Sequence, residues 1–184
     1  MEGFACLDCI CWLYHIDAAS LHSQSNKYDP SQKANIKAAL RLSGKRKVGI
    51  LAHQAALEMT TKIFEARNLP PEEAYQVASG LVWANLRGID SHGIIRIPGY
   101  MMRLDKGIVN PRPKMRIVKE TLAAMVIDAD HGHGQVAITF GMKRAIEKAK
   151  KASIGWVLVS KTKHSGAVGY YTRMAANAGM AGVF

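Results

Sequence analysis

Leu122-Ala123-Ala124-Met125-Val126-Ile127, followed by Gly132-His133-Gly134-Gln135-Val136-Ala137, is the part of the sequence that decides the fold. The first six residues predict a buried strand because they form a short apolar run, and the second six predict a glycine turn into a helix. That helix is expected from Gln135 to Lys151, and a second buried strand from Gly155 to Ser160. A strand, a helix and a strand in this order predict a mixed α/β unit.

The glycine turn also fits the Gly-x-Gly-x-x-Ala fingerprint of dinucleotide-binding Rossmann folds. That fold needs an acidic residue roughly 20 residues further on, at the end of the next strand, to bind the ribose. Here the next strand ends in Val159-Ser160-Lys161, which contains no acidic residue. We therefore interpret Gly132 and Gly134 as a tight turn and expect a non-Rossmann arrangement.

The remaining segments predict a helical module before this unit. Amphipathic spacing predicts helices at about 52–68, from Pro71 to about 86, and from Asp90 or Ser91 to about 106. After the second strand, residues 167–178 predict another helix, and the apolar residues 181–184 a final strand. We expect three parts: an extension (1–47), the helical module (48–112) and a partial α/β domain (113–184).

The composition is that of a soluble globular chain. With 184 residues, 48% hydrophobic and 21% charged, the chain is long enough for a domain with a core. The sequence contains no apolar run of the roughly 18–20 residues that span a bilayer. The apolar start contains Glu2 and Asp8 and lacks a basic region, so it is a poor secretory signal. We expect a cytoplasmic protein without a membrane partner.

The net charge of +11 raises the possibility of a nucleic-acid partner, so its distribution matters. Seven basic and four acidic residues lie in 1–47, and eighteen basic and ten acidic residues lie in 48–184. The excess is thus spread along the chain. A basic cluster at residues 143–151 falls on a predicted helix without an adjacent set of aromatic residues for stacking, so we expect no nucleic-acid partner.

The three cysteines lie close together near the start, at Cys6, Cys9 and Cys11, with His15 behind them. Such a group could hold zinc, but the sequence supplies no second ligand pair of the kind that structural sites use. We expect no metal.

Two histidines, each beside a serine and a glycine, are the candidate chemical groups. His92 lies in Asp90-Ser91-His92-Gly93, and His164 lies in His164-Ser165-Gly166. Histidine is the commonest acid or base near neutral pH, and the fork of Arg96 matches a carboxylate. His92, Arg96 and Tyr100 are spaced by four, which would place them on one helix face. The pattern predicts redox or proton chemistry on a small carboxylic acid, although a helix-cap neighbour and a loop histidine without function would look the same.

Three ordered motifs resemble one known family: Asp90-Ser91-His92-Gly93 with Arg96 and Tyr100, Asp128-Ala129-Asp130 before the glycine turn, and His164-Ser165-Gly166 before Gly169-Tyr170-Tyr171. Together they resemble the malate/L-lactate dehydrogenase family, which is not of the Rossmann type and also holds ureidoglycolate and sulfolactate dehydrogenases and diketogulonate reductase. The resemblance covers residues 48–184, and we expect the family's C-terminal part to be missing.

The resemblance implies an α/β fold in which a helical module precedes the start of a mixed-sheet nicotinamide-nucleotide-binding domain. It implies an oxidoreductase that transfers a hydride between NAD or NADP and a small 2-hydroxy or 2-oxo acid of the malate or L-lactate type. Full-length members imply a homodimer.

The resemblance also implies residue roles. The family's proton-transfer histidine matches His164 in some members and His92 in others, so both are candidates, and we favour His164. Ser91, Arg96 and Tyr100 would bind the substrate, and His92, Ser165 and Gly166 would contact the cofactor.

Three alternatives stay open or are set aside. An inactive fragment or interaction module of this family would have the same motifs, and a basic nucleic-acid-binding protein would have the same charge. A serine hydrolase does not fit, because neither Ser91 nor Ser165 lies in a Gly-x-Ser-x-Gly turn.

Overall fold

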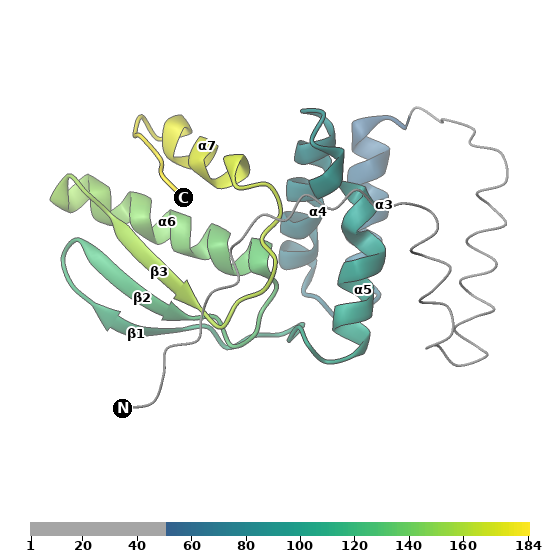
Figure 1. Cartoon of the computed structure of the whole chain (residues 1–184), viewed down its shortest axis with the longest axis horizontal. Coiled ribbons are helices and arrows are strands. Elements are labelled where there is room, and N and C mark those ends of the chain that lie inside the picture. The colour runs from purple at the N-terminus through teal and green to yellow at the C-terminus, as the bar shows by residue number, and fades with distance from the viewer. Residues whose placement is uncertain (1–50) are drawn as a thin grey trace, which may run out of the picture. The chain divides into compact units, whose positions relative to one another are not determined.

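The computed structural model describes residues 51–184, which belong to one unit, Ile50–Phe184. Helices α3, α4 and α5 lie together at one end, and the sheet with α6 and α7 lies at the other (Figure 1). In chain order the elements are α3 (His53–Glu65), α4 (Pro71–Asn85), the 3-10 helices η3 (Asp90–His92) and η4 (Ile94–Arg96), α5 (Ile97–Asp105), β1 (Arg116–Glu120), β2 (Ala124–Asp128), α6 (Gly134–Ala152), β3 (Trp156–Ser160) and α7 (Gly169–Asn177).

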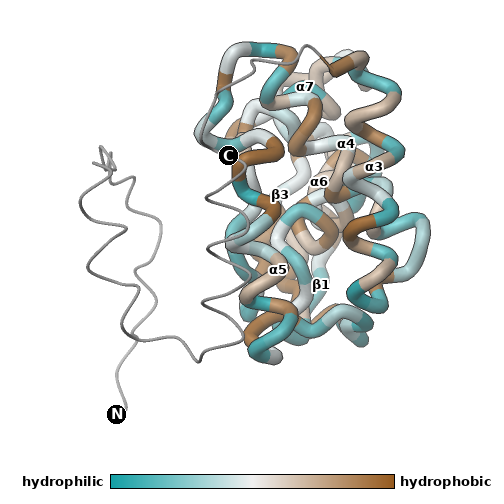
Figure 2. Tube along the Cα trace, turned by 90° about the vertical axis from the view of Figure 1, so that its right-hand side faces the viewer, coloured by the Kyte–Doolittle hydropathy of each residue, from teal (hydrophilic) through white to brown (hydrophobic). Residues whose placement is uncertain are grey.

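The two predicted helices α3 and α4 are confirmed. Pro71 opens α4 and two carboxylates follow in its first turn, where they complement the helix dipole. Hydrophobic and hydrophilic residues alternate along the helices (Figure 2), so each has a face that can be buried. The main cluster of buried side chains joins α3, α4, α5 and α6; it consists of Phe64, Leu69, Ala74, Val77, Leu81, Tyr100 and Val136.

The sheet is mixed, as predicted. Its strand order is β1-β2-β3, with β1 antiparallel to β2 and β2 parallel to β3. Helix α6 covers one face of the sheet: a Cβ added to Gly141 would lie 2.8 Å from Val159 and 3.5 Å from Val157. The strand β2 and the helices α6 and α7 lie where the sequence predicts them, whereas β1 was not predicted.

Two predictions about the end of the chain are wrong. Strand β3 is only half-buried, and on one side: Val157 and Val159 face α6, whereas Trp156 is 59% exposed and Leu158 is 55% exposed on the face that α6 leaves uncovered. Residues 181–184 form no strand; instead the ring of Phe184 stacks on Tyr171 with centroids 5.6 Å apart.

The single helix predicted from residue 90 to residue 106 is also wrong, because two 3-10 turns precede α5. The Asn85 side chain lies inside this turn, where its Oδ1 accepts from Ile94 N at 2.8 Å and its Nδ2 donates to Asp90 at 2.6 Å. A Cβ on Gly93 would overlap the Asn85 amide, so only glycine allows this approach. The chain therefore turns at Gly93 and begins a regular helix only at Ile97.

The glycine turn leads into α6, as the sequence predicted, and packing explains why its residues are glycines. A Cβ on Gly134 would overlap the carbonyl oxygens of Lys163 and His164, and one on Gly132 would lie 2.7 Å from Pro113. The loop after β3 therefore lies directly on the amino end of α6. His133 caps this helix, since its Nδ1 accepts from Gln135 N at 3.4 Å.

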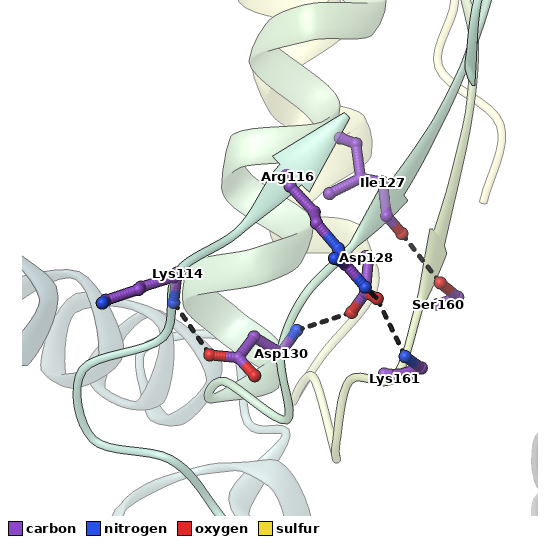
Figure 3. A network of polar contacts seen from close by, with 7 residues as sticks. All are labelled: Lys114, Arg116, Ile127, Asp128, Asp130, Ser160 and Lys161. Carbon is purple, nitrogen blue, oxygen red and sulfur yellow. Dashed lines mark hydrogen bonds and ion pairs between the residues drawn. The ribbon is translucent and has the colours of Figure 1, made fainter. Parts of the chain in front are cut away.

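Asp128 ties the ends of the three strands together (Figure 3). Its buried carboxylate accepts hydrogen bonds from Arg116 at 3.0 Å, from Lys161 at 2.9 Å and from Asp130 N at 3.0 Å. These donors hold the pKa of Asp128 well below its usual range, the Lys161 bond being the largest cause. Asp130 in turn accepts from Lys114 N at 3.0 Å, which fixes the entry to β1.

Some sequence predictions fall outside the described residues: the cysteine group, the poor signal sequence and the extension 1–47. Within residues 51–184, no helix is long and apolar enough to cross a membrane. The same residues contain no group of three or more His, Cys, Asp or Glu side chains that could hold a metal ion.

Candidate functional site

His164 lies in the loop between β3 and α7, beyond the carboxyl end of a parallel strand, which is where α/β proteins commonly bind ligands. Its Nδ1 meets two groups: the hydroxyl of Tyr100 at 2.7 Å and the backbone N–H of Gly166 at 3.2 Å. Tyr100 comes from α5, 64 residues earlier. The fold thus joins the helical module to the β3–α7 loop at one imidazole.

His92, the other candidate histidine, stacks on His164 with ring centroids 5.6 Å apart and an angle of 23° between the rings. The Nδ1 of His92 is paired with the Ser91 hydroxyl at 2.9 Å. The turn built on Asn85 and Gly93 places both residues. The structure thereby brings together the two histidines that the resemblance offers for proton transfer.

Arg96 is exposed at the end of η4, and its Nε donates to the carbonyl oxygen of Ser91. Arg96 ends η4 and Tyr100 lies within α5, so these two residues and His92 do not lie on one regular helix as predicted. The Tyr100 hydroxyl is paired with His164 Nδ1, and Arg96 lies near enough for its charge to act on the pKa of both Tyr100 and His164.

The site also includes His133, which sequence reasoning treated only as part of the glycine turn. Its ring is 3% exposed and lies edge-on to Tyr100, with centroids 4.6 Å apart, and to Phe64, with centroids 5.8 Å apart. No periodicity or motif predicts this contact. Its position immediately before a helix, where capping groups occur, was the available signal.

Burial and positive charge keep all three imidazoles neutral at pH 7. Burial is the largest cause that lowers the pKa of His164 to about 4, with Arg96 second. Burial likewise lowers the pKa of His133 to about 3, and it lowers that of His92, where Arg96 again contributes. Burial raises the pKa of Tyr100 to about 12, so its hydroxyl keeps its proton.

The residues expected to hold the cofactor do not form a phosphate-binding turn. The Gly166 amide is used by His164, and the Ser165 carbonyl oxygen accepts from the Tyr171 hydroxyl. The amino end of α6, where a Rossmann fold would bind the pyrophosphate, is covered by the backbone of Lys163 and His164. Neither of these two places therefore offers free backbone amides to a phosphate.

Two hollows lie away from the histidines. One of about 200 Å³ lies between α3 and α4, with Leu57 and Tyr75 in its wall, and one of about 370 Å³ lies between β1 and α6, with Leu122 and Lys151 in its wall. Neither is lined by a histidine, so the candidate site is the histidine cluster formed by His92, His133 and His164.

A comparison with protein families matches residues 51–184 to the malate/L-lactate dehydrogenase family. The chain belongs to this family. The dehydrogenase motifs read from the sequence, around His92, Asp128 and His164, all lie within the matched residues.

Individual dehydrogenases of this family are similar to the chain at the level of sequence and structure. Malate dehydrogenase of Pyrococcus horikoshii is 42% identical over 122 residues, 66% of this chain and 34% of that protein. Ureidoglycolate dehydrogenase (NAD(+)) of Escherichia coli O157:H7 is 39% identical over 115 residues, 62% of this chain and 33% of that protein. The solved sulfolactate dehydrogenase of Methanocaldococcus jannaschii superposes with a TM-score of 0.69 and 39% identity, over 70% of this chain and 38% of that one.

The chain spans about a third of the length of these curated dehydrogenases. By name, these three relatives act on malate, ureidoglycolate and sulfolactate, which are small hydroxy acids.

Proposed function

We propose that this chain supplies the substrate and proton-transfer side of an NAD(P)-dependent oxidoreductase that interconverts a small 2-hydroxy acid and its 2-oxo acid. The observation that carries the proposal is the contact of His164 with Tyr100 and His92 beside the positive charge of Arg96. Membership of the malate/L-lactate dehydrogenase family supports the reaction class.

The proposed roles follow from the chemistry of the side chains. Reduction of a 2-oxo acid adds one hydride to carbon 2 and one proton to its oxygen. We assign the exchange of that proton to His164, whose Nδ1 is held from two sides, by the Tyr100 hydroxyl and the Gly166 N–H, so that Nε2 is left for the substrate. Arg96, exposed and always charged, binds the carboxylate. His92 and Ser91 lie beside His164 and Arg96, and they contact the substrate.

A nicotinamide dinucleotide supplies or accepts the hydride in this chemistry. We assign it from kinship, since the name of one relative specifies NAD(+). His92 and Ser165 remain the candidates for contact with its nicotinamide end. The amino end of α6 is covered and the Gly166 N–H is bonded to His164, so neither is free to bind its phosphates.

Calorimetric titration of the whole chain with pyruvate and with oxaloacetate tests the substrate side. Arg96→Met should weaken binding by roughly tenfold to a hundredfold, the value of a charge-assisted hydrogen bond. Arg87→Met is the matched control, because its guanidinium lies 4.0 Å over the Trp83 ring on α4, outside the histidine cluster. The absence of binding of either acid, or an equal effect of both substitutions, would contradict the proposal.

A further inference from the structure

The two groups that meet His164 Nδ1 differ in what they can do. The backbone N–H of Gly166 can only donate a hydrogen bond, whereas the hydroxyl of Tyr100 can donate or accept. A neutral imidazole has one nitrogen that donates and one that accepts. Since an amide N–H points at Nδ1, that nitrogen must be the acceptor, and the ring proton must be on Nε2.

The position of the Gly166 amide depends on glycine. Gly166 has a φ of +77°, which lies in the left-handed region that favours glycine. A Cβ there would also lie 2.6 Å from the Nε2 of the buried Gln135. The same local contact occurs at the other buried histidine, since His133 Nδ1 accepts from the N–H two residues on. Both histidines thus accept a hydrogen bond from the turn that follows them.

We propose that Gly166 and Tyr100 hold His164 as the Nε2–H tautomer, so that the resting site offers a hydrogen-bond donor and prefers a 2-oxo acid over the matching 2-hydroxy acid. The preference rests on the proposed function, whereas the tautomer does not. A ketone oxygen only accepts, so it pairs directly with Nε2–H. A substrate hydroxyl that is to lose its proton must instead donate to a bare Nε2.

Oxidation therefore requires the other tautomer, whose unprotonated Nε2 takes the proton of the substrate hydroxyl and so turns the ring into an imidazolium. In the reverse direction the imidazolium returns this proton to the substrate oxygen. In that tautomer Nδ1–H donates to the hydroxyl oxygen of Tyr100, which can turn to accept, but it faces the Gly166 N–H, which cannot. Gly166 thus discriminates between the two tautomers, whereas the Tyr100 hydroxyl can form a hydrogen bond with either of them. Both act as positioning residues, through His164.

Nitrogen-15 NMR of the whole chain, labelled at histidine, at about pH 8 measures the tautomer directly, because protonated and bare ring nitrogens have distinct shifts. The wild type should show a bare Nδ1 and a protonated Nε2 at His164. Tyr100→Phe should keep that pattern, because the Gly166 amide remains. A protonated Nδ1 in the wild type, or a reversal of the tautomer in Tyr100→Phe, would overturn the proposal.

Gly166→Ala keeps the backbone N–H, but the φ of +77° and the contact of the added Cβ with Gln135 should displace it from Nδ1. Loss of this bond should move the tautomer ratio toward Nδ1–H by roughly fivefold, the value of one neutral hydrogen bond. Gly99→Ala is the control, since a Cβ there meets nothing within 4 Å. An unchanged ratio in a folded Gly166→Ala variant would overturn the proposal. If that variant does not fold, the wild-type spectrum still tests whether the ring proton of His164 is on Nε2.

Titration with the pair pyruvate and L-lactate tests the preference. Tighter binding of pyruvate by several-fold supports it, and equal or tighter binding of lactate overturns it. If the Nε2–H tautomer is found but neither acid binds, the tautomer stands and the proposed function fails.

Discussion

His133 shows how one side chain can shape the site without reaching the substrate position. It is buried between Phe64 and Tyr100, and it also caps α6. Tyr100 is the residue whose hydroxyl meets His164, so the packing of His133 helps to set the position of that hydroxyl. The sequence placed His133 in the right turn but gave no reason to assign it to the site, because the contact with Tyr100 joins segments far apart in the chain.

His133→Ala should lower the free energy of unfolding by about 3 kcal/mol, since it removes a buried ring and a helix cap. His133→Asn should recover about 1 kcal/mol, because the asparagine oxygen can accept from Gln135 N in place of the imidazole. Urea denaturation measures both. Equal loss in the two variants would show that the capping bond contributes nothing.

At the scale of elements, the sequence predicts a helix or strand correctly where the residues of that segment alone determine its structure. The apolar run of β2 and the long amphipathic pattern of α6 were both predicted. The prediction failed at residues 90–96, where the Asn85 side chain replaces backbone bonds of a regular helix. It failed again at β3, because apolar residues on both sides of the strand predict burial on both sides, whereas α6 covers only one.

The two faces of β3 should respond differently to the same substitution. Val157→Thr places a hydroxyl against α6 at Gly141 and should cost about 1–2 kcal/mol of unfolding free energy. Leu158→Thr lies on the uncovered face and should change stability by about 0.5 kcal/mol or less. Urea midpoints of the two variants test this. A large loss in Leu158→Thr would mean that this face is covered in solution.

At the scale of the whole molecule, the lowered pKa values of the buried histidines make folding stability depend on pH. An unfolded histidine has a pKa of about 6.5, whereas the folded values are about 4 for His164 and about 3 for His133. Below pH 6.5 the unfolded chain therefore binds protons that the folded chain does not. Stability should be full above about pH 6.5 and should fall as the pH drops toward about 4 and then 3.

Urea midpoints at about pH 8, 6.5 and 4.5 check this dependence. The midpoint should be similar at the two higher values and clearly lower at the third. His133→Asn should show a smaller drop, because it removes an imidazole whose pKa folding lowers to about 3. A midpoint that stays constant down to about pH 4.5 would show that the buried rings are protonated in the folded state.

The mixed sheet has a consequence for the order in which the chain folds. Strands β1 and β2 are joined by a tight turn in which Thr121 and Ala124 exchange hydrogen bonds, whereas β2 and β3 can pair only after the chain has passed through all of α6. Short loops close at lower entropic cost than long ones, so the antiparallel pair should form early and the parallel pair late. In stopped-flow measurements, Val157→Thr should therefore speed unfolding and leave the folding rate nearly unchanged. A slower folding phase in that variant would instead place the parallel pair in the rate-limiting step.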